Sequence, residues 1–157
     1  MNPVDAAADA IEDLIRLEPG LLGLDELSLD EQAGPDKWSR KEILGHLIDS
    51  AVNNMHRFVR MQFMDRLEFP GYEQDNWVDA SRYSERAWPD LVALWKSLNQ
   101  HLVHMIRHVD PHALQHTWLG PEGEVTLEFV IVDYPKHMKH HIDQITTSTL
   151  SKPVSKR

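Results

Sequence analysis

The chain has 157 residues, of which 41% are hydrophobic and 26% charged, and this balance is typical of one soluble globular domain. Its formal net charge of −9 opposes a phosphate backbone, so we exclude nucleic acid as a partner. The absence of cysteine excludes disulfides, thiolate metal ligands and a cysteine nucleophile. No apolar run spans a bilayer, and the first residues carry acids where a signal peptide is basic, so we expect a cytoplasmic protein without a membrane segment.

Two helices are predicted in the first half of the chain. Apolar residues recur at helical spacing over Pro3–Leu17, and Pro19-Gly20 ends this pattern. A polar linker follows. Ser39 and Glu42 then match a capping box at the start of a second helix that reaches about Met64.

The second half predicts two more helices. The third begins at Ser84 or Pro89 and continues to Val109, and the fourth runs from about Thr126 to Leu150. Pro135 lies inside the fourth helix and removes one backbone donor, so we expect a kink just before His137.

The remaining segments are predicted to be loops. Residues 68–82 contain Pro70-Gly71 and no sustained period, which indicates an ordered loop. Residues 118–123 predict a tight turn or a pair of short strands, too short for a sheet. Together the elements predict an all-α protein, an antiparallel four-helix bundle over residues 1–150, with a basic tail at 151–157 that we expect to be disordered.

His137 and His141 form the most informative pair among the ten histidines. Residues four apart share one helix face, so both imidazoles could reach one ion, and both lie at the edge of the apolar stripe. Such a pair also recurs by chance on helix surfaces. A metal centre therefore needs a third ligand from another element.

His46 is the candidate for this third ligand, and it shares its helix face with a polar stripe that includes Asp49, Asn53 and Arg57. The stripe is either a solvated surface or the lining of a wet cleft, in which these three residues would contact a substrate or fix an imidazole tautomer. Four further histidines could compete as ligands: His56, His101, His104 and His108. Tryptophans such as Trp118 are expected in the core or an interface, not in a substrate site.

Three separated motifs resemble the DinB/YfiT-like family in the order in which the family has them: residues 38–50 (WSRKEILGHLIDS), residues 75–77 (DNW) and the histidine motif at 137–145. The resemblance implies a four-helix bundle with a three-histidine metal site, formed here by His46, His137 and His141, with His140 outside it. Pro135 departs from the family pattern. The family includes transferases that use low-molecular-weight thiols such as bacillithiol, mycothiol-dependent isomerases and members without an assigned reaction.

The resemblance leads to a hypothesis of a metal-dependent thiol S-transferase, in which a metal-bound thiolate attacks a small electrophile. A metal-dependent hydrolase of amides or esters, using metal-bound water, is the alternative. A non-catalytic stress-response module that binds metal is a third interpretation, and a bundle without metal is the fourth. Zinc is the default ion and nickel its rival, because imidazole suits both. We also expect a homodimer.

Overall fold

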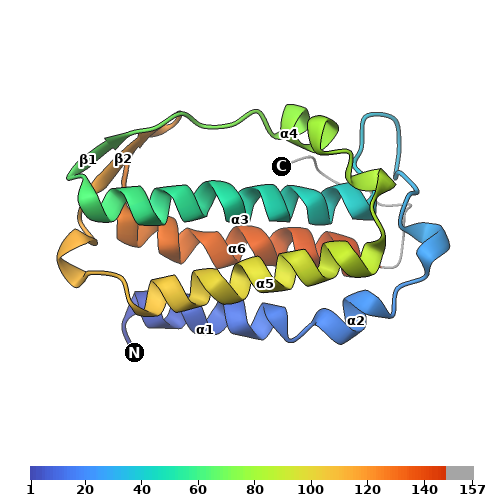
Figure 1. Cartoon of the computed structure of the whole chain (residues 1–157), viewed down its shortest axis with the longest axis horizontal. Coiled ribbons are helices and arrows are strands. Elements are labelled where there is room, and N and C mark those ends of the chain that lie inside the picture. Colours follow the sequence, from blue (N-terminus) through green and yellow to red (C-terminus); the bar gives the residue numbers. More distant parts are fainter. Residues whose placement is uncertain (148–157) are drawn as a thin grey trace.

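The computed structural model describes residues 1–147, and four long helices form its body (Figure 1). They are α1 (Pro3–Ile15), α3 (Arg40–Phe63), α5 (Trp88–Arg107) and α6 (Leu127–Thr146). Helix α3 packs against α5 and α6, and α1 packs against the same two helices from the other side. The predicted four-helix bundle is confirmed, and the helix bounds agree with the predicted ones to within a few residues. The predicted end of the fourth helix at Leu150 and the basic tail lie outside the described residues.

The four helices do not simply alternate in direction. The colours of Figure 1 show that α1 and α6 run one way along the bundle, whereas α3 and α5 run the other way. Helix α3 is therefore antiparallel to α6, and the first half of α3 lies beside the second half of α6. This arrangement places residue 46 at the same level of the bundle as residues 137 and 141.

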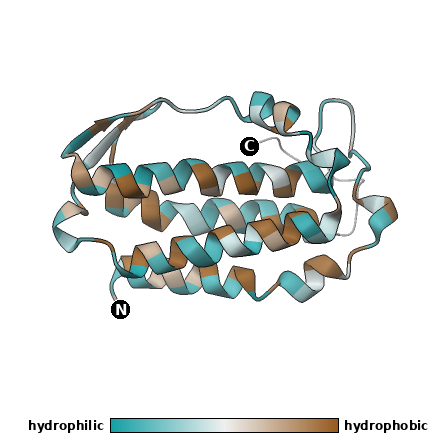
Figure 2. Cartoon of the chain, in the orientation of Figure 1, coloured by the Kyte–Doolittle hydropathy of each residue, from teal (hydrophilic) through white to brown (hydrophobic). Residues whose placement is uncertain are grey.

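Local sequence signals explain where the helices begin. The Ser39 hydroxyl accepts a hydrogen bond from the backbone N–H of Glu42, whose carboxylate accepts one from the backbone N–H of Ser39, so the predicted capping box is present. Thr126 caps α6 by accepting a hydrogen bond from the backbone N–H of Phe129. Along each long helix, hydrophobic and hydrophilic residues alternate in stripes (Figure 2).

Short helices connect the long ones. Helix α2 (Glu18–Leu22) contains Pro19 in its first turn, where proline needs no backbone donor, so the polar linker expected there is partly helical. Short 3-10 turns cover Glu26–Ser28, Tyr83–Glu85 and Pro111–Ala113.

The connection between α3 and α5 corrects the predicted loop. It contains α4 (Gln74–Ser81), which buries Val78 against α3, although its short length hid the helical period. Figure 1 shows this connection returning along α3 to the end where α3 begins. The return allows α5 to run parallel to α3. We call residues 69–82 the crossover segment.

A small sheet also corrects the sequence analysis, which expected no sheet. Strand β1 (Arg66–Glu68) pairs in parallel with β2 (Thr117–Gly120), and β2 pairs antiparallel with β3 (Gly123–Thr126). The sequence predicted the two strands of the hairpin as one of two alternatives. The third strand of the sheet, β1, comes from about fifty residues earlier in the chain, and no local sequence pattern indicates such a non-local pairing. The sheet lies at the end of the bundle where α3 stops and α6 starts (Figure 1).

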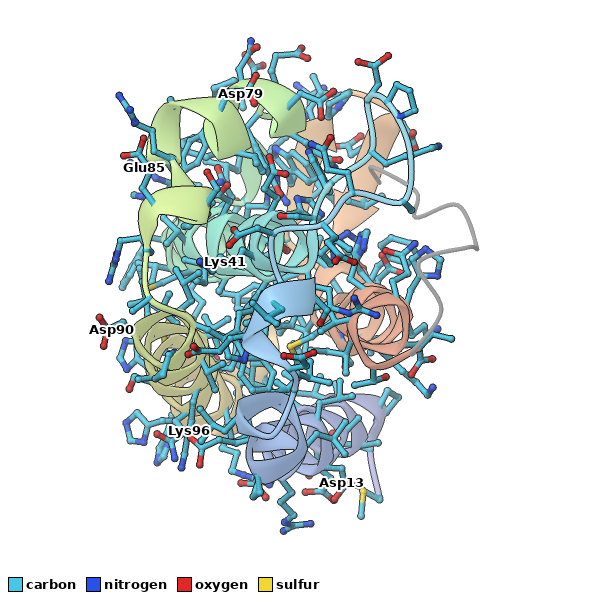
Figure 3. The ribbon with its side chains drawn as sticks, turned by 90° about the vertical axis from the view of Figure 1, so that its right-hand side faces the viewer. Asp13, Lys41, Asp79, Glu85, Asp90 and Lys96 are labelled. Carbon is cyan, nitrogen blue, oxygen red and sulfur yellow. The ribbon has the colours of Figure 1, made fainter. Side chains whose placement is uncertain are left out.

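Apolar side chains from all four long helices fill one continuous core, which includes the fully buried Ile11, Leu44, Trp95 and Ile142. Viewed along the bundle, charged side chains stand on its periphery (Figure 3): Asp13, Asp79, Glu85 and Asp90. Within residues 1–147, no helix is both long and apolar enough to cross a membrane.

Candidate metal centre

Three histidines from two helices converge inside the bundle. His46 on α3 and His141 on α6 are fully buried, and His137 is half-buried. One potential ligand nitrogen of each residue lies within 4.8 Å of the other two. Helix α6 is continuous through Pro135, so this proline leaves His137 facing His46. The sequence-predicted metal ligands are therefore close together, whereas His56, His101, His104 and His108 are exposed and lie outside the cluster.

The separations of the imidazole nitrogens match those of ligands on one ion. Nε2 of His46 lies 3.2 Å from Nε2 of His137. Two nitrogens at ordinary zinc distances and a tetrahedral angle are about 3.3 Å apart. The ring centroid of His141 lies 4.7 Å from the centroids of both other rings. The three residues therefore lie close enough together to hold one divalent metal.

Two nitrogens in the cluster have no hydrogen-bond partner among the described residues. They are Nδ1 of His46 and Nε2 of His141, and both are buried. Buried polar atoms are seldom left unpaired in native proteins, and a bound ion is one of the standard reasons for an unpaired nitrogen such as Nε2 of His141. Nδ1 of His141 lies 2.8 Å from Oε1 of Gln144, and since an amide oxygen only accepts, Nδ1 carries the proton. This leaves the lone pair on Nε2 of His141 free for a metal.

Burial keeps all three imidazoles neutral. Desolvation, reinforced by the two neighbouring histidines, lowers the pKa of His46 to about 3. Desolvation and His137 lower the pKa of His141 to about 4, and desolvation also lowers the pKa of His137. Neutral imidazole is the form that binds a metal, so the cluster offers three lone pairs at physiological pH without competition from protons.

The polar stripe next to His46 is buried, so its interpretation as a solvated surface is wrong for most of its length. Asp49 is 3% exposed, Asn53 6% and Arg57 9%, and only Arg60 at the far end is exposed. The crossover segment and the sheet cover this side of α3. The stripe therefore belongs to the protein interior and its cleft.

The three predicted substrate-binding residues have different positions. Asp49 accepts a hydrogen bond from the hydroxyl of Tyr83, and burial raises its pKa to about 6. Asn53 donates to the backbone carbonyl of Asp49 at 2.9 Å. Neither residue is among those that line the cleft beside His137, whereas Arg57 is.

A cleft of about 390 Å³ opens beside the histidine cluster. His137 lines it, so the potential metal position borders this space. One wall is formed by α3 and α6, and the other by the crossover segment and the β2–β3 hairpin. Among its lining residues are Ser50, Asn54, Arg57, Tyr72, Trp118 and Asp133. Trp118 packs against the core, as expected, and in addition it lines this cleft.

The sequence pattern that defines the DinB superfamily matches residues 12–145. The chain belongs to the DinB superfamily. A "Putative metal-dependent hydrolase" of Bacillus mycoides is 27% identical over 146 residues, covering 92% of this chain and 84% of the relative. A protein of the same name from Halalkalibacterium halodurans is 26% identical over 131 residues, covering 83% and 76% of the two chains.

The fold of this DinB-superfamily member is also found in a solved structure. YfiT from Bacillus subtilis, described as a probable metal-dependent hydrolase with an unusual four-helix bundle topology, superposes with a TM-score of 0.75 at 21% identity. The superposition covers 91% of this chain and 83% of YfiT. In the present chain α3 and α5 run parallel, so its bundle departs from simple alternation (Figure 1).

Sequence reasoning missed several residues of the site in this DinB-superfamily chain. Gln144 was part of the quoted motif, and its position three residues after His141 was the available signal that it orients an imidazole. Asn54 lies eight residues after His46, so helical spacing could have placed it on the same face as Ser50, which belongs to the polar stripe. No local signal indicated Tyr72, because the crossover segment brings it to α3 from a distant part of the sequence.

Proposed function

We propose that this protein is a metal-dependent enzyme that transfers a low-molecular-weight thiol to an electrophilic carbon. His46, His137 and His141 would hold the divalent metal, with zinc as the default ion and nickel as its rival. The observation that carries the proposal is the position of the cluster: three neutral imidazoles converge on one point, and His137 borders a cleft large enough for a small molecule.

The donor set suits catalysis better than a purely structural role. Structural zinc sites use four protein ligands, whereas catalytic sites commonly use three and leave a position for substrate. The cleft beside His137 favours an enzyme over a non-catalytic metal-binding module, which would have saturated coordination and no open cleft. When bound, the metal lowers the pKa of a coordinated thiol or water and makes its reaction accessible at neutral pH.

The chain's own residues supply orientation and shielding. Gln144 fixes the tautomer of His141, and the ring of Trp38, with its centroid 4.8 Å from that of His46, covers the cluster from the side of α3. Since the chain contains no cysteine, the reacting sulfur would come from a cosubstrate. In the reaction the sulfur forms a bond to carbon, the leaving group departs with its bonding electrons, and the thiol proton is released.

Hydrolysis of an amide or ester is the second candidate, and two observations favour it. The relatives from Bacillus mycoides and Halalkalibacterium halodurans carry the name of hydrolases. Asp133, four residues before His137 and lining the same cleft, offers a carboxylate that could accept a proton from water. The hydrolase would act equally well without an added thiol, which distinguishes it from the transferase.

The test uses protein purified without a histidine tag. Elemental analysis would first identify the bound metal, and we expect about one divalent ion per chain. Thiol consumption would then be followed with alkyl halides and epoxides for zinc-loaded and nickel-loaded protein. We expect a rate above that of the free thiol, and we expect the rate to vanish when a chelator removes the metal.

A matched pair of variants controls this experiment. His137→Ala removes a proposed ligand and should abolish both metal binding and turnover. His101→Ala changes an exposed histidine on α5 outside the cluster and should preserve both. Equal metal content in the two variants would overturn the proposed centre. A metal-loaded protein with no rate above background for any electrophile would reject the transferase.

A further inference from the structure

Arg57 is a buried charge without an acidic partner. Its side chain is 9% exposed, and its Nε has no hydrogen-bond partner among the described residues. Its Nη1 donates to the amide oxygen of Asn54, at 3.3 Å. None of the ion pairs found within residues 1–147 includes it. Burying an unpaired cation costs free energy, and an anion bound from outside the chain would offset this cost for the guanidinium of Arg57.

The surroundings of Arg57 hold the guanidinium in one place. Its central carbon lies 4.0 Å from the ring centroid of Trp118. The indole N–H of Trp118 donates to the backbone carbonyl of Phe69 at 2.8 Å, and its ring lies against Gly120, where an added Cβ would come within 2.8 Å of it. Arg57 and Trp118 both line the cleft that contains His137. The guanidinium is therefore pre-organised in this cleft.

The charges around the cleft select the type of anion. Asp133 and Glu122 also line it, so a multiply charged group such as a phosphate dianion would meet repulsion. A single carboxylate matches the planar fork of a guanidinium with less repulsion. The buried Ser50 and the half-buried Tyr72, whose side chains hydrogen-bond to each other, complete a polar surface near Arg57.

We infer that Arg57 binds a carboxylate of the substrate or of the thiol cosubstrate, and so sets which molecules enter the cleft. This inference rests on the proposed function, because it concerns the same cleft. Arg57 lies eleven residues after His46 on the same face of α3, about 16 Å along the helix axis. Its side chain leans back toward the start of α3, which shortens this distance. The ligand is therefore an elongated molecule with its carboxylate several bonds from the reacting atom.

A length series of thiols tests this inference on cobalt-substituted protein, in which the visible absorption reports coordination of sulfur. The probes are mercaptopropanoic, mercaptohexanoic and mercaptooctanoic acids, each compared with the mercaptoalcohol of equal chain length. We expect the longer acids to bind about tenfold more tightly than their alcohols, and the short acid to show no advantage. Arg57→Met should abolish the preference for acids without changing cobalt content.

Arg60→Met is the matched control. Arg60 is exposed on the same helix, where it stacks on Phe69 outside the cleft lining, so this variant should keep the preference. Equal binding of acids and alcohols by the wild-type protein would overturn the carboxylate assignment and leave the thiol transferase intact. Loss of the preference in both arginine variants would also overturn it, because a general loss of positive charge would then explain the effect.

A second measurement needs neither a thiol nor a variant that could misfold. The Nε–H resonance of Arg57, observed by nitrogen-15 NMR, should shift and saturate on titration with hexanoate, and hexanol should leave it unchanged. If no thiol perturbs cobalt but hexanoate shifts this resonance, thiol transfer fails and carboxylate binding stands. If hexanoate leaves the resonance unchanged, the inference about Arg57 falls whatever the cobalt spectra show.

Discussion

The aromatic ring of Tyr83 lies directly against the backbone of Gly45, the residue before the metal-ligand candidate His46. A Cβ built at Gly45 would come within 2.1 Å of a ring carbon of Tyr83. The hydroxyl of Tyr83 in turn donates to Asp49, one helical turn further along α3. The glycine is therefore required by close packing and not by a turn, since it lies inside a continuous helix.

Gly45→Ala should destabilise the protein although alanine favours helices. Relieving the overlap requires movement of a buried ring, and overpacking of this kind costs about 1–3 kcal/mol. Urea unfolding would measure the loss. Gly20→Ala is the matched control, because nothing lies within 4 Å of an added Cβ in α2, and it should be neutral or slightly stabilising. Equal stability of the two variants would contradict the packing argument.

Gln144→Ala should weaken metal binding more than it weakens the fold. Gln144 is half-buried, and its amide oxygen holds the proton of His141 on Nδ1, so its loss frees the ring to adopt the wrong tautomer. Losing such an outer hydrogen bond typically lowers metal affinity about tenfold or more. Competition with a chelating dye would give the affinity. An unchanged affinity would mean that packing alone orients His141.

Arg40→Met should loosen the carboxyl end of α6. Arg40 is buried, and it donates from Nε to the carbonyl of Ile145 and from Nη2 to that of Thr147, both at 2.8 Å. Charged donors at the negative end of a helix dipole stabilise it, and we expect a loss of about 2 kcal/mol in the free energy of unfolding. Hydrogen exchange should show the loss concentrated in the last turns of α6, near His141. Arg16→Met at the end of α1 is the control, since both partners of its ion pair with Asp13 are exposed.

The metal-free protein should lose stability as the pH falls. Unfolded histidines titrate near 6.5, whereas His46 and His141 titrate near 3 and 4 in the folded protein, so between these limits the unfolded chain binds more protons. Asp49 acts in the opposite direction, because its folded pKa of about 6 lies above its ordinary value of 3.8. The pKa values of the two histidines are shifted further from their ordinary value than that of Asp49, and there are two histidines against one aspartate. We therefore expect a loss of about 2 kcal/mol between pH 7 and 5.

Urea unfolding at several pH values would measure how the free energy of unfolding changes between pH 7 and 5. His46→Asn should flatten the profile, because asparagine cannot take up a proton. A metal-free protein that is equally stable at pH 5 and pH 7 would show that the cluster is more hydrated than its burial implies.

The sequence could predict the bundle and the pairing of His137 with His141 because both depend on local periodicity and spacing, whereas the choice of His46 depended on the resemblance to the DinB/YfiT-like family. Helical repeats located the long helices, and the spacing of His137 and His141 placed both on one face. The polar stripe around Asp49 remained ambiguous, because a helical period reports a polar face but not what covers it. What covers it is the crossover segment and the sheet, and both depend on non-local pairings such as Leu67 with Trp118.

The proposed metal ligands and the residues that surround Arg57 lie on different parts of the chain. The proposed metal ligands stand on bundle helices whose positions the core determines, whereas Tyr72 belongs to the crossover segment and Trp118 to the hairpin at the margin of that core. Substitutions in these elements could change ligand preference with little effect on folding. A library randomised at residues 72–74, 121 and 122 should therefore yield folded, metal-loaded proteins with altered selectivity, which makes this scaffold suitable for directed evolution.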